Sequence, residues 1–252
     1  MLKKMLKILK NPKILYYHYG HYLRYLLECF KIDTLSKPYG IENLDHHKKL
    51  LKYFSYQDGF FIEIGGFDGY FHSPTYYLEK FLKWKGVLVE PDPFHFKKCK
   101  YNRKKTTVMN SACVSFQYPE KTVTISCLSH STHIKGTADN KNGWIEKMQE
   151  QIPTERREAT VPAQTLTAIL HEHFKENSKR TIDLFVLDVE EYELEVLKGL
   201  DFSQYAPSFL LVESHTNARQ QQVESFLSPK GYQMIEKISH QDYLYKKHEN
   251  PI

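Results

Sequence analysis

The stretch FFIEIGGFDGY (residues 60–70) decides the predicted fold, because a short apolar run ends there in a glycine-rich turn. Such a run is typical of a buried strand, and glycines after it let the backbone approach a ligand closely. A second run, GVLVEPD (residues 86–92), ends in acidic residues. An acid at the end of a second strand suits recognition of ribose hydroxyls. No lysine of the P-loop type follows the glycines, so binding of a nucleoside triphosphate is not expected.

Three further runs that are apolar on both faces extend this pattern, at residues 106–115, 182–190 and 208–214. Helical segments separate the runs, at residues 74–83, 93–100, 166–174, 191–200 and 218–227. This alternation predicts an α/β fold with a mostly parallel sheet. The last two strands, residues 232–240 and 241–247, are expected to form an antiparallel hairpin at the sheet edge.

An insertion at about residues 116–161 interrupts the alternation of strands and helices. It begins with the alternating segment KTVTISCLS (residues 121–129), which predicts an extra strand or a hairpin. The polar remainder is long enough to be a functional lid or a mobile loop. Its Trp144, Arg156 and Arg157 are predicted to contact the acceptor, since arginine pairs suit an anionic group.

The formal net charge of +5 is concentrated at the start of the chain. Residues 1–52 hold ten Lys and one Arg against four acids, whereas the body, residues 53–252, is slightly acidic. Residues 1–52 are predicted to form a basic helical extension, because their first apolar residues recur at helical spacing: Leu2, Met5, Leu6 and Leu9. Two interpretations of the lysines stay open: a solvated helix face, or attachment of residues 1–30 to anionic lipid. Nucleic-acid binding is not expected, because no recognition module is evident.

Composition excludes several classes of protein. The 252 residues are 14% aromatic, which excludes a disordered chain. The sequence contains no run of about 18 apolar residues, which excludes a polytopic membrane protein. The four cysteines form no CxxC pair, so neither a disulfide scaffold nor a cysteine-based zinc site is expected. A cytoplasmic location is the prediction, with a peripheral position at the inner face of the membrane if residues 1–30 bind lipid. The oligomeric state stays open.

Several segments together resemble the FkbM family of S-adenosylmethionine-dependent methyltransferases: IEIGGFDGYFHSPTYYLEKFLKWKGVLVEPDP, NSACVS, VPAQTL, IDLFVLDVEEYELEVLKGLDF and LLVESH. The resemblance covers about residues 58–247 and implies a Rossmann-like, seven-stranded methyltransferase sheet with S-adenosylmethionine as cofactor. Two positions depart from the family's pattern. Gly66-Phe67 replaces a small residue and Asn before Asp-Gly, and Glu191 replaces the glycine after Asp-Val-Glu.

The resemblance also implies which residues hold the cofactor. The glycine turn would lie at the methionine side, and Glu90 would bind the ribose. Ser111 and Ala112 would border the adenine, while Asp188 would face the methionine end or the acceptor. The predicted cofactor-binding set is Glu63, Gly65, Gly66, Asp68, Gly69, Tyr70, Glu90, Pro91, Asp92, Ser111, Ala112 and Asp188.

The candidates for catalysis follow the fourth and fifth strands, at the edge where ligands bind in open α/β sheets: Glu190, Glu213 and His215. His215 is the predicted general base, since its unperturbed pKa lies near neutrality, and a surface histidine is the alternative. Asp188 and Glu213 would suit a divalent metal. The favoured alternative is that these carboxylates hydrogen-bond backbone or acceptor hydroxyls. His72 is a further candidate for contact with acceptor or cofactor.

The resemblance implies O-methylation of a sugar hydroxyl, in a surface glycan or its precursor. Two alternatives stay open. One is methylation of a lipid or a small secondary metabolite. The other is a non-catalytic S-adenosylmethionine-binding module, for which the departures at Phe67 and Glu191 are the reason.

Overall fold

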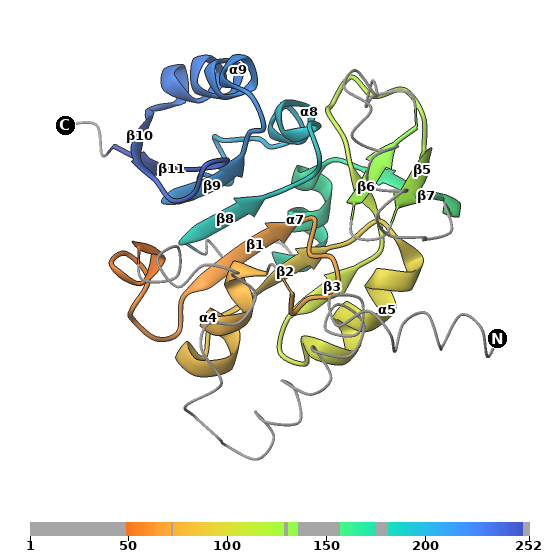
Figure 1. Cartoon of the computed structure of the whole chain (residues 1–252), viewed down its shortest axis with the longest axis horizontal. Coiled ribbons are helices and arrows are strands. Elements are labelled where there is room, and N and C mark those ends of the chain that lie inside the picture. Colours follow the sequence, from red (N-terminus) through yellow and green to blue (C-terminus); the bar gives the residue numbers. More distant parts are fainter. Residues whose placement is uncertain (1–48, 72, 129–130, 136–156, 175–180, 249–252) are drawn as a thin grey trace, which may run out of the picture.

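The protein is described by a computed structural model, which covers residues 49–71, 73–128, 131–135, 157–174 and 181–248. Its main feature is a seven-stranded sheet in the order β10-β11-β9-β8-β1-β2-β3 (Figure 1). The strands are β1 (Phe60–Ile64), β2 (Lys85–Val89), β3 (Thr107–Met109), β8 (Leu184–Leu187), β9 (Phe209–Glu213), β10 (Tyr232–Lys237) and β11 (Asp242–Lys247). Neighbours from β3 to β9 run parallel, whereas β11 is antiparallel to both β9 and β10. The predicted fold class, including the antiparallel C-terminal hairpin, is confirmed.

Helices cover both faces of this sheet, because the side chains of β1 alternate between two apolar layers. Phe60, Ile62 and Ile64 pack with the helices of one layer, and Phe61 packs in the other. The first layer contains α7 (Leu166–Phe174), α8 (Glu193–Leu197) and α9 (Asn217–Leu227). The second contains α4 (Pro74–Leu82), and α5 (Pro93–Asn102) ends on the same side, where Arg103 lies 5.1 Å from the ring of Phe61.

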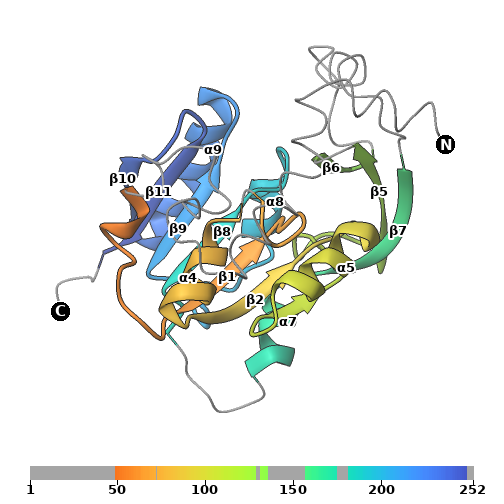
Figure 2. The same ribbon diagram turned by 60° about the horizontal axis from the view of Figure 1, so that its bottom comes forward.

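A second sheet, in the order β4-β7-β5-β6, lies beside the main one, next to α5 (Figure 2). Its strands are β4 (Ala112–Cys113), β5 (Thr122–Leu128), β6 (Ser131–Ile134) and β7 (Arg157–Gln164). The alternating segment of the insertion therefore forms β5, which pairs antiparallel with both β6 and β7. Trp144 and Arg156, like residues 1–48 of the predicted N-terminal extension, lie outside the described residues.

The prediction of one strand over residues 106–115 is wrong. The segment is divided between β3 in the main sheet and β4 in the second sheet. The division falls at Asn110 and Ser111, whose side chains bond to other parts of the chain. Asn110 donates to the carbonyls of Glu90 and Pro91, at 2.9 and 2.7 Å, and Ser111 donates to the carbonyl of Pro162. These bonds redirect the backbone from one sheet to the other. Within the described part of the chain, none of the helices has the length and apolar character required to cross a membrane.

Candidate active site

The parallel strands β1, β2, β8 and β9 bring the predicted site residues to one edge of the main sheet. Their carboxyl ends lead into the glycine turn at residues 65–69, Glu90–Asp92, Asp188–Glu191 and Glu213–His215. Direct contacts tie these segments together. The amide of Gly65 donates to the carbonyl of Val89 at 3.0 Å, and that of Phe67 donates to the Glu90 carboxylate at 2.8 Å. These segments therefore lie together at one edge of the sheet, and ligand binding there stays a prediction.

The glycines of the turn are required by its backbone. Gly65 and Gly69 have φ values of +88° and +75°, in the left-handed region that favours glycine. A Cβ on Gly65 would lie 1.7 Å from the carbonyl oxygen of Asp188, so the turn packs directly against the end of β8. Asp68 stabilises the turn by accepting from the amides of Tyr70 and Phe71, at 2.9 and 2.7 Å. His72 lies outside the described residues.

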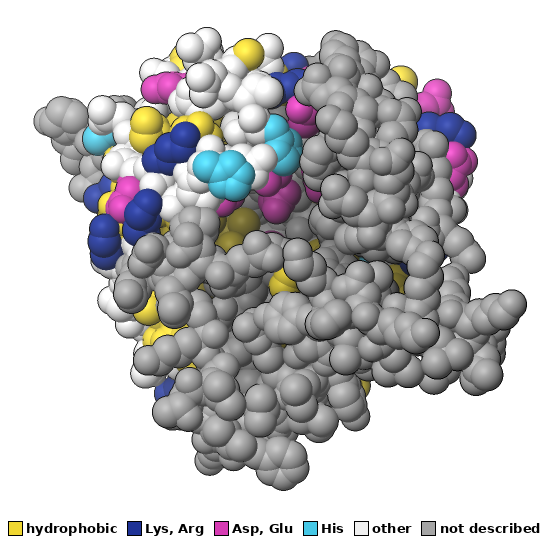
Figure 3. All heavy atoms as spheres, in the orientation of Figure 1, with side chains coloured by type: hydrophobic (Ala, Val, Ile, Leu, Met, Phe, Trp, Pro, Cys, Tyr) yellow, Lys and Arg dark blue, Asp and Glu magenta, His cyan; other side chains and the backbone are white. Residues whose placement is uncertain are grey.

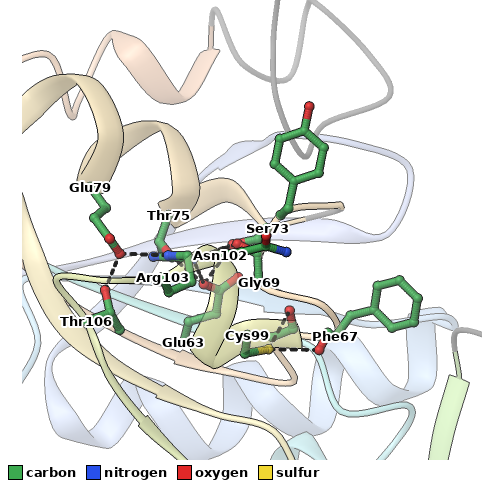
Figure 4. Close-up of polar contacts among 12 residues, drawn as sticks. Glu63, Phe67, Gly69, Ser73, Thr75, Glu79, Cys99, Asn102, Arg103 and Thr106 are labelled. Atoms are coloured by element: carbon green, nitrogen blue, oxygen red, sulfur yellow. Dashed lines mark hydrogen bonds and ion pairs between the residues drawn. The ribbon is translucent and has the colours of Figure 1, made fainter. Parts of the chain in front are cut away.

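The last turn of α5 holds the glycine turn from outside, a feature that sequence reasoning missed (Figure 4). Three consecutive carbonyls, of residues 67, 68 and 69, each accept one bond from this helix end. Their donors are Cys99 Sγ at 2.9 Å, Asn102 Nδ2 at 2.8 Å and Arg103 Nη1 at 3.3 Å. The backbone that would meet a cofactor is thus fixed by side chains behind it.

Arg103 also joins two buried carboxylates beneath the turn. Its guanidinium lies 3.2 Å from Glu63 and 2.7 Å from Glu79, and all three side chains are at most 8% exposed. Glu63 accepts further bonds from Ser73 and Thr75 through the same oxygen that meets Arg103. Burial raises the pKa of Glu63, whereas the charge of Arg103 opposes that shift. Glu63 therefore already has three donors, and its contact with a cofactor stays a prediction.

Glu90, at the end of β2, is 3% exposed and accepts one backbone amide on each carboxylate oxygen, from Phe67 and Asp92, both at 2.8 Å. Burial raises the pKa of Glu90 to about 8. At neutral pH the group is therefore mostly a neutral carboxyl, which can both accept a hydrogen bond from a hydroxyl and donate one to it.

Asp92 is the N-cap residue of α5. It accepts from the amide of Phe94 at 2.9 Å, and Arg157 and His95 lie 2.6 and 3.0 Å from it. Burial alone would raise the pKa of Asp92, but His95, the Phe94 amide and Arg157 outweigh burial and lower it to about 2. Asp92 thereby ties β7 to α5. Arg157 pairs with Asp92, and its predicted contact with the acceptor stays a prediction.

The remaining predicted cofactor residues lie around this edge. Gly66 packs against Leu88, and the buried Tyr70 has its ring 4.8 Å from that of Tyr76 in an edge-on arrangement. Ser111 and Ala112, both buried, lie where the chain enters the second sheet. Pro91 accepts from Asn110 through its carbonyl. Whether these residues contact a cofactor stays a prediction.

Acidic and histidine side chains gather on one face of the molecule, near the ends of β8 and β9 (Figure 3). His215 Nε2 lies 3.3 Å from Glu213 and 3.5 Å from Glu190, and Nδ1 meets the side-chain amide of Gln241. Bonds with Glu190 and Glu213 raise the pKa of His215 to about 11. The unperturbed pKa near neutrality, on which the choice of His215 as general base rests, does not apply at this position, because two carboxylates stabilise its proton. At neutral pH it is an imidazolium, which cannot accept another proton.

Asp188 shares a hydrogen bond with Glu213 at the same place. Burial and the charge of Glu213 raise the pKa of Asp188 well above its usual value. The pKa of Glu213 is lowered, because its bonds to His215 and Asp188 outweigh its burial. The proton of this pair therefore lies on Asp188.

The predicted metal pair was Asp188 and Glu213. The structure instead brings ligand atoms of Glu190, Glu213 and His215 within 4.8 Å of one another. A proton on His215 already accounts for the close approach of the two carboxylates. A metal at this position stays a prediction.

The loop after β8 has a strained backbone. Glu190 and Glu191 have φ values of +56° and +73°, which non-glycine residues rarely adopt. Glu193, also missed from the sequence, holds this loop by accepting from the amides of Val189 and Glu191, at 3.3 and 3.0 Å. Burial raises the pKa of Glu193 to about 7. The left-handed backbone is thus present at Glu191, where the family's pattern has glycine.

This fold and site define an α/β methyltransferase of the Rossmann-like class. Residues 63–245 match the family model described as "Methyltransferase FkbM domain". Because this match covers well over half of the 252 residues, the chain belongs to the FkbM family of S-adenosylmethionine-dependent methyltransferases. A comparison with curated protein sequences gives no significant match.

Solved structures with similar folds include three described as methyltransferases. The FkbM methyltransferase from Methylobacillus flagellatus is 15% identical, with a TM-score of 0.45 and coverage of 75% of this chain. This chain spans only 43% of that one, less than half of its length. The human methyltransferase 10 domain containing protein is 12% identical, with a TM-score of 0.44 and coverage of 83% and 84% of the two chains. An Aquifex aeolicus SAM-dependent methyltransferase is 14% identical, with a TM-score of 0.41 and coverage of 86% and 96%.

Proposed function

We propose that this chain uses S-adenosylmethionine to methylate a hydroxyl group of a sugar, in a surface glycan or its precursor. The observation that carries the proposal is the cluster of Asp188, Glu190, Glu213 and His215 beside the glycine turn. Hydroxyl groups are donors that carboxylates accept, so such a cluster suits an acceptor with several hydroxyls. The choice of a sugar comes from the family resemblance.

The residues at the edge of the sheet fit the cofactor. The left-handed glycine turn allows close approach of its backbone, and the Glu90 carboxyl can form hydrogen bonds with the ribose hydroxyls. When bound, S-adenosylmethionine supplies an electrophilic methyl group on its sulfonium. The protein must then align the acceptor oxygen with that group, exclude water and receive the acceptor's proton.

Glu190 is our candidate for receiving that proton. Its carboxylate has His215 as its partner in the described part of the chain, whereas Glu213 bonds to both His215 and Asp188. The imidazolium of His215 holds the two carboxylates in place. His215 therefore acts here as a positioning residue and not as the base that the sequence suggested.

Isothermal titration with S-adenosylmethionine and with S-adenosylhomocysteine tests the cofactor part. Binding of both is expected, and a Glu90→Gln variant should bind more weakly because its NH2 group replaces one of the two oxygens that accept from backbone amides. Glu120→Gln, at an exposed position, is the matched control and should bind normally. If neither compound binds to the unmodified chain, the cofactor proposal is wrong. Binding without turnover on glycan extracts would favour the non-catalytic module.

A further inference from the structure

The outer face of α5 carries lysines and aromatic rings in a single stripe. Phe94, Lys97, Lys98 and Tyr101 are all exposed and follow the i, i+3, i+4, i+7 spacing of one helix face. Phe94 is 49% exposed and Tyr101 is 60% exposed. The stripe, defined here as these four residues with Lys104 and Lys105, continues just beyond the helix end.

The opposite face of α5 fixes this stripe in position. His95, Cys99 and Arg103 recur at intervals of four residues and are at most 3% exposed. Cys99 and Arg103 bond to the glycine turn, and Arg103 also joins the buried carboxylates. The helix therefore cannot rotate to bury its lysines without breaking these bonds. Figure 2 shows α5 on the outside of the main sheet.

The stretch of sequence that forms the stripe is positively charged. The sequence contains no Asp or Glu between Asp92 and Glu120. The carboxylate of Asp92 is buried and already paired with Arg157, whose guanidinium also lies 4.5 Å from the ring of Phe94. Nothing in this stretch of sequence therefore neutralises the exposed lysines.

The lysines and rings are arranged in pairs. The ammonium of Lys98 lies 4.5 Å from the ring of Phe94, and that of Lys104 lies 5.0 Å from the ring of Tyr101. Amphipathic side chains of these kinds are typical of a membrane interface, where rings insert and lysines reach the headgroups. In a site for nucleic acid, by contrast, the ring faces would be needed for stacking on bases.

We propose that the stripe on α5 binds an anionic phospholipid surface. Lysine is attracted to acidic headgroups, and the two exposed rings add apolar contact at the interface. Phe94 lies just beyond Asp92, so the stripe begins at the edge of the sheet that carries the candidate active site. The stripe does not include residues 1–30 of the sequence, and the proposal does not depend on the methyl acceptor.

Vesicle sedimentation of the full chain tests this proposal. The vesicles contain phosphatidylcholine alone or phosphatidylcholine mixed with phosphatidylserine. The test variant changes Lys97, Lys98, Lys104 and Lys105 to Gln, and the matched control changes four other exposed lysines to Gln: Lys80, Lys83, Lys85 and Lys121. Binding to the mixed vesicles should fall by more than about tenfold in the test variant. It should stay near that of the unmodified chain in the control, and added salt should weaken it.

A second variant, Phe94→Ala with Tyr101→Ala, keeps the charges and should bind the mixed vesicles more weakly than the unmodified chain. Circular dichroism melts should be alike for all variants, because every changed residue is exposed. Equal binding by the unmodified chain and the lysine variant would overturn the proposal. Loss of binding to a labelled single-stranded RNA, with vesicle binding unchanged, would assign the stripe to nucleic acid instead and overturn it as well.

Discussion

Glu191 has a left-handed backbone at φ +73° where the family's pattern places glycine. A non-glycine residue in this conformation costs about 1 kcal/mol or more. The ion pair of Glu191 with Arg219 stabilises the fold too little to offset this cost. The two groups lie 3.7 Å apart and both are more than a third exposed. Phe67, the other departure, also has a positive φ, of +49°. At both positions, therefore, the backbone has a conformation that glycine would adopt more easily than the residue present.

Replacing Glu191 by glycine should thus stabilise the protein. We expect the free energy of unfolding to rise by about 1 kcal/mol, as measured by urea denaturation. Glu191→Ala is the matched control, because it removes the same carboxylate and keeps a Cβ on the strained backbone. A gain of equal size in the alanine variant would show that the carboxylate, and not the backbone, causes the strain.

His215 should make stability depend on pH in a defined direction. Its folded pKa of about 11 lies above its ordinary value of 6.5. A raised pKa stabilises the folded state fully below pH 6.5, and the contribution is lost as pH rises toward 11. The difference in unfolding free energy between the unmodified chain and His215→Gln should therefore be largest at mildly acidic pH and shrink as pH rises. A difference that does not change with pH would contradict this assignment of the proton.

Activity gives a second test of the same residue. If His215 positions Glu190 as an imidazolium, the rate of methyl transfer should show no inflection near pH 6.5. An inflection there that disappears in His215→Gln would restore His215 as the base.

At the scale of elements, the strands of the main sheet were predictable from the sequence. The hydrogen bonds by which the end of α5 holds the glycine turn were not. The runs at residues 60–64 and 85–89 are apolar on both faces, which a covered parallel strand requires. The segment KKCKYNRKK (residues 97–105), in contrast, suggests a solvated surface. The spacing of His95, Cys99 and Arg103 was the available signal, but a buried arginine is recognisable only once Glu63 and Glu79 are brought beside it. The division of β3 from β4 likewise depends on bonds to distant carbonyls.

The buried arginine gives a prediction at this scale. Arg103→Met would leave Glu63 and Glu79 without their counter-charge and should lower the unfolding free energy by about 3–5 kcal/mol. Adding Glu63→Gln and Glu79→Gln should recover part of the loss, because neutral side chains are less costly to bury. Urea denaturation of the single and triple variants measures both effects. A triple variant less stable than Arg103→Met would show that the carboxylates do not need the arginine's charge.

At the scale of the whole molecule, topology places distant residues in one site. Glu63, Glu90, Asp188 and Glu213 come from four strands, and the parallel order of those strands sets their acids at one edge. That gathering was predictable from the sequence. The protonation of the cluster was not predictable from the sequence. The pKa of His215, which follows β9, is raised by its contact with Glu190, which follows β8. Between the site and the outer surface lies α5, whose inner face holds the glycine turn and whose outer face carries the lysine stripe.

The central claim is methyl transfer to a sugar hydroxyl assisted by the cluster at Glu190. It is tested most directly by transfer of tritium from methyl-labelled S-adenosylmethionine into fractionated cell-surface glycans. The unmodified chain should label a carbohydrate fraction, and Glu190→Gln should reduce the rate by about a hundredfold or more, as loss of a proton acceptor does. The variant should bind the cofactor as before. Cofactor binding by the unmodified chain with no label in any carbohydrate fraction, or full labelling by Glu190→Gln, would contradict the claim.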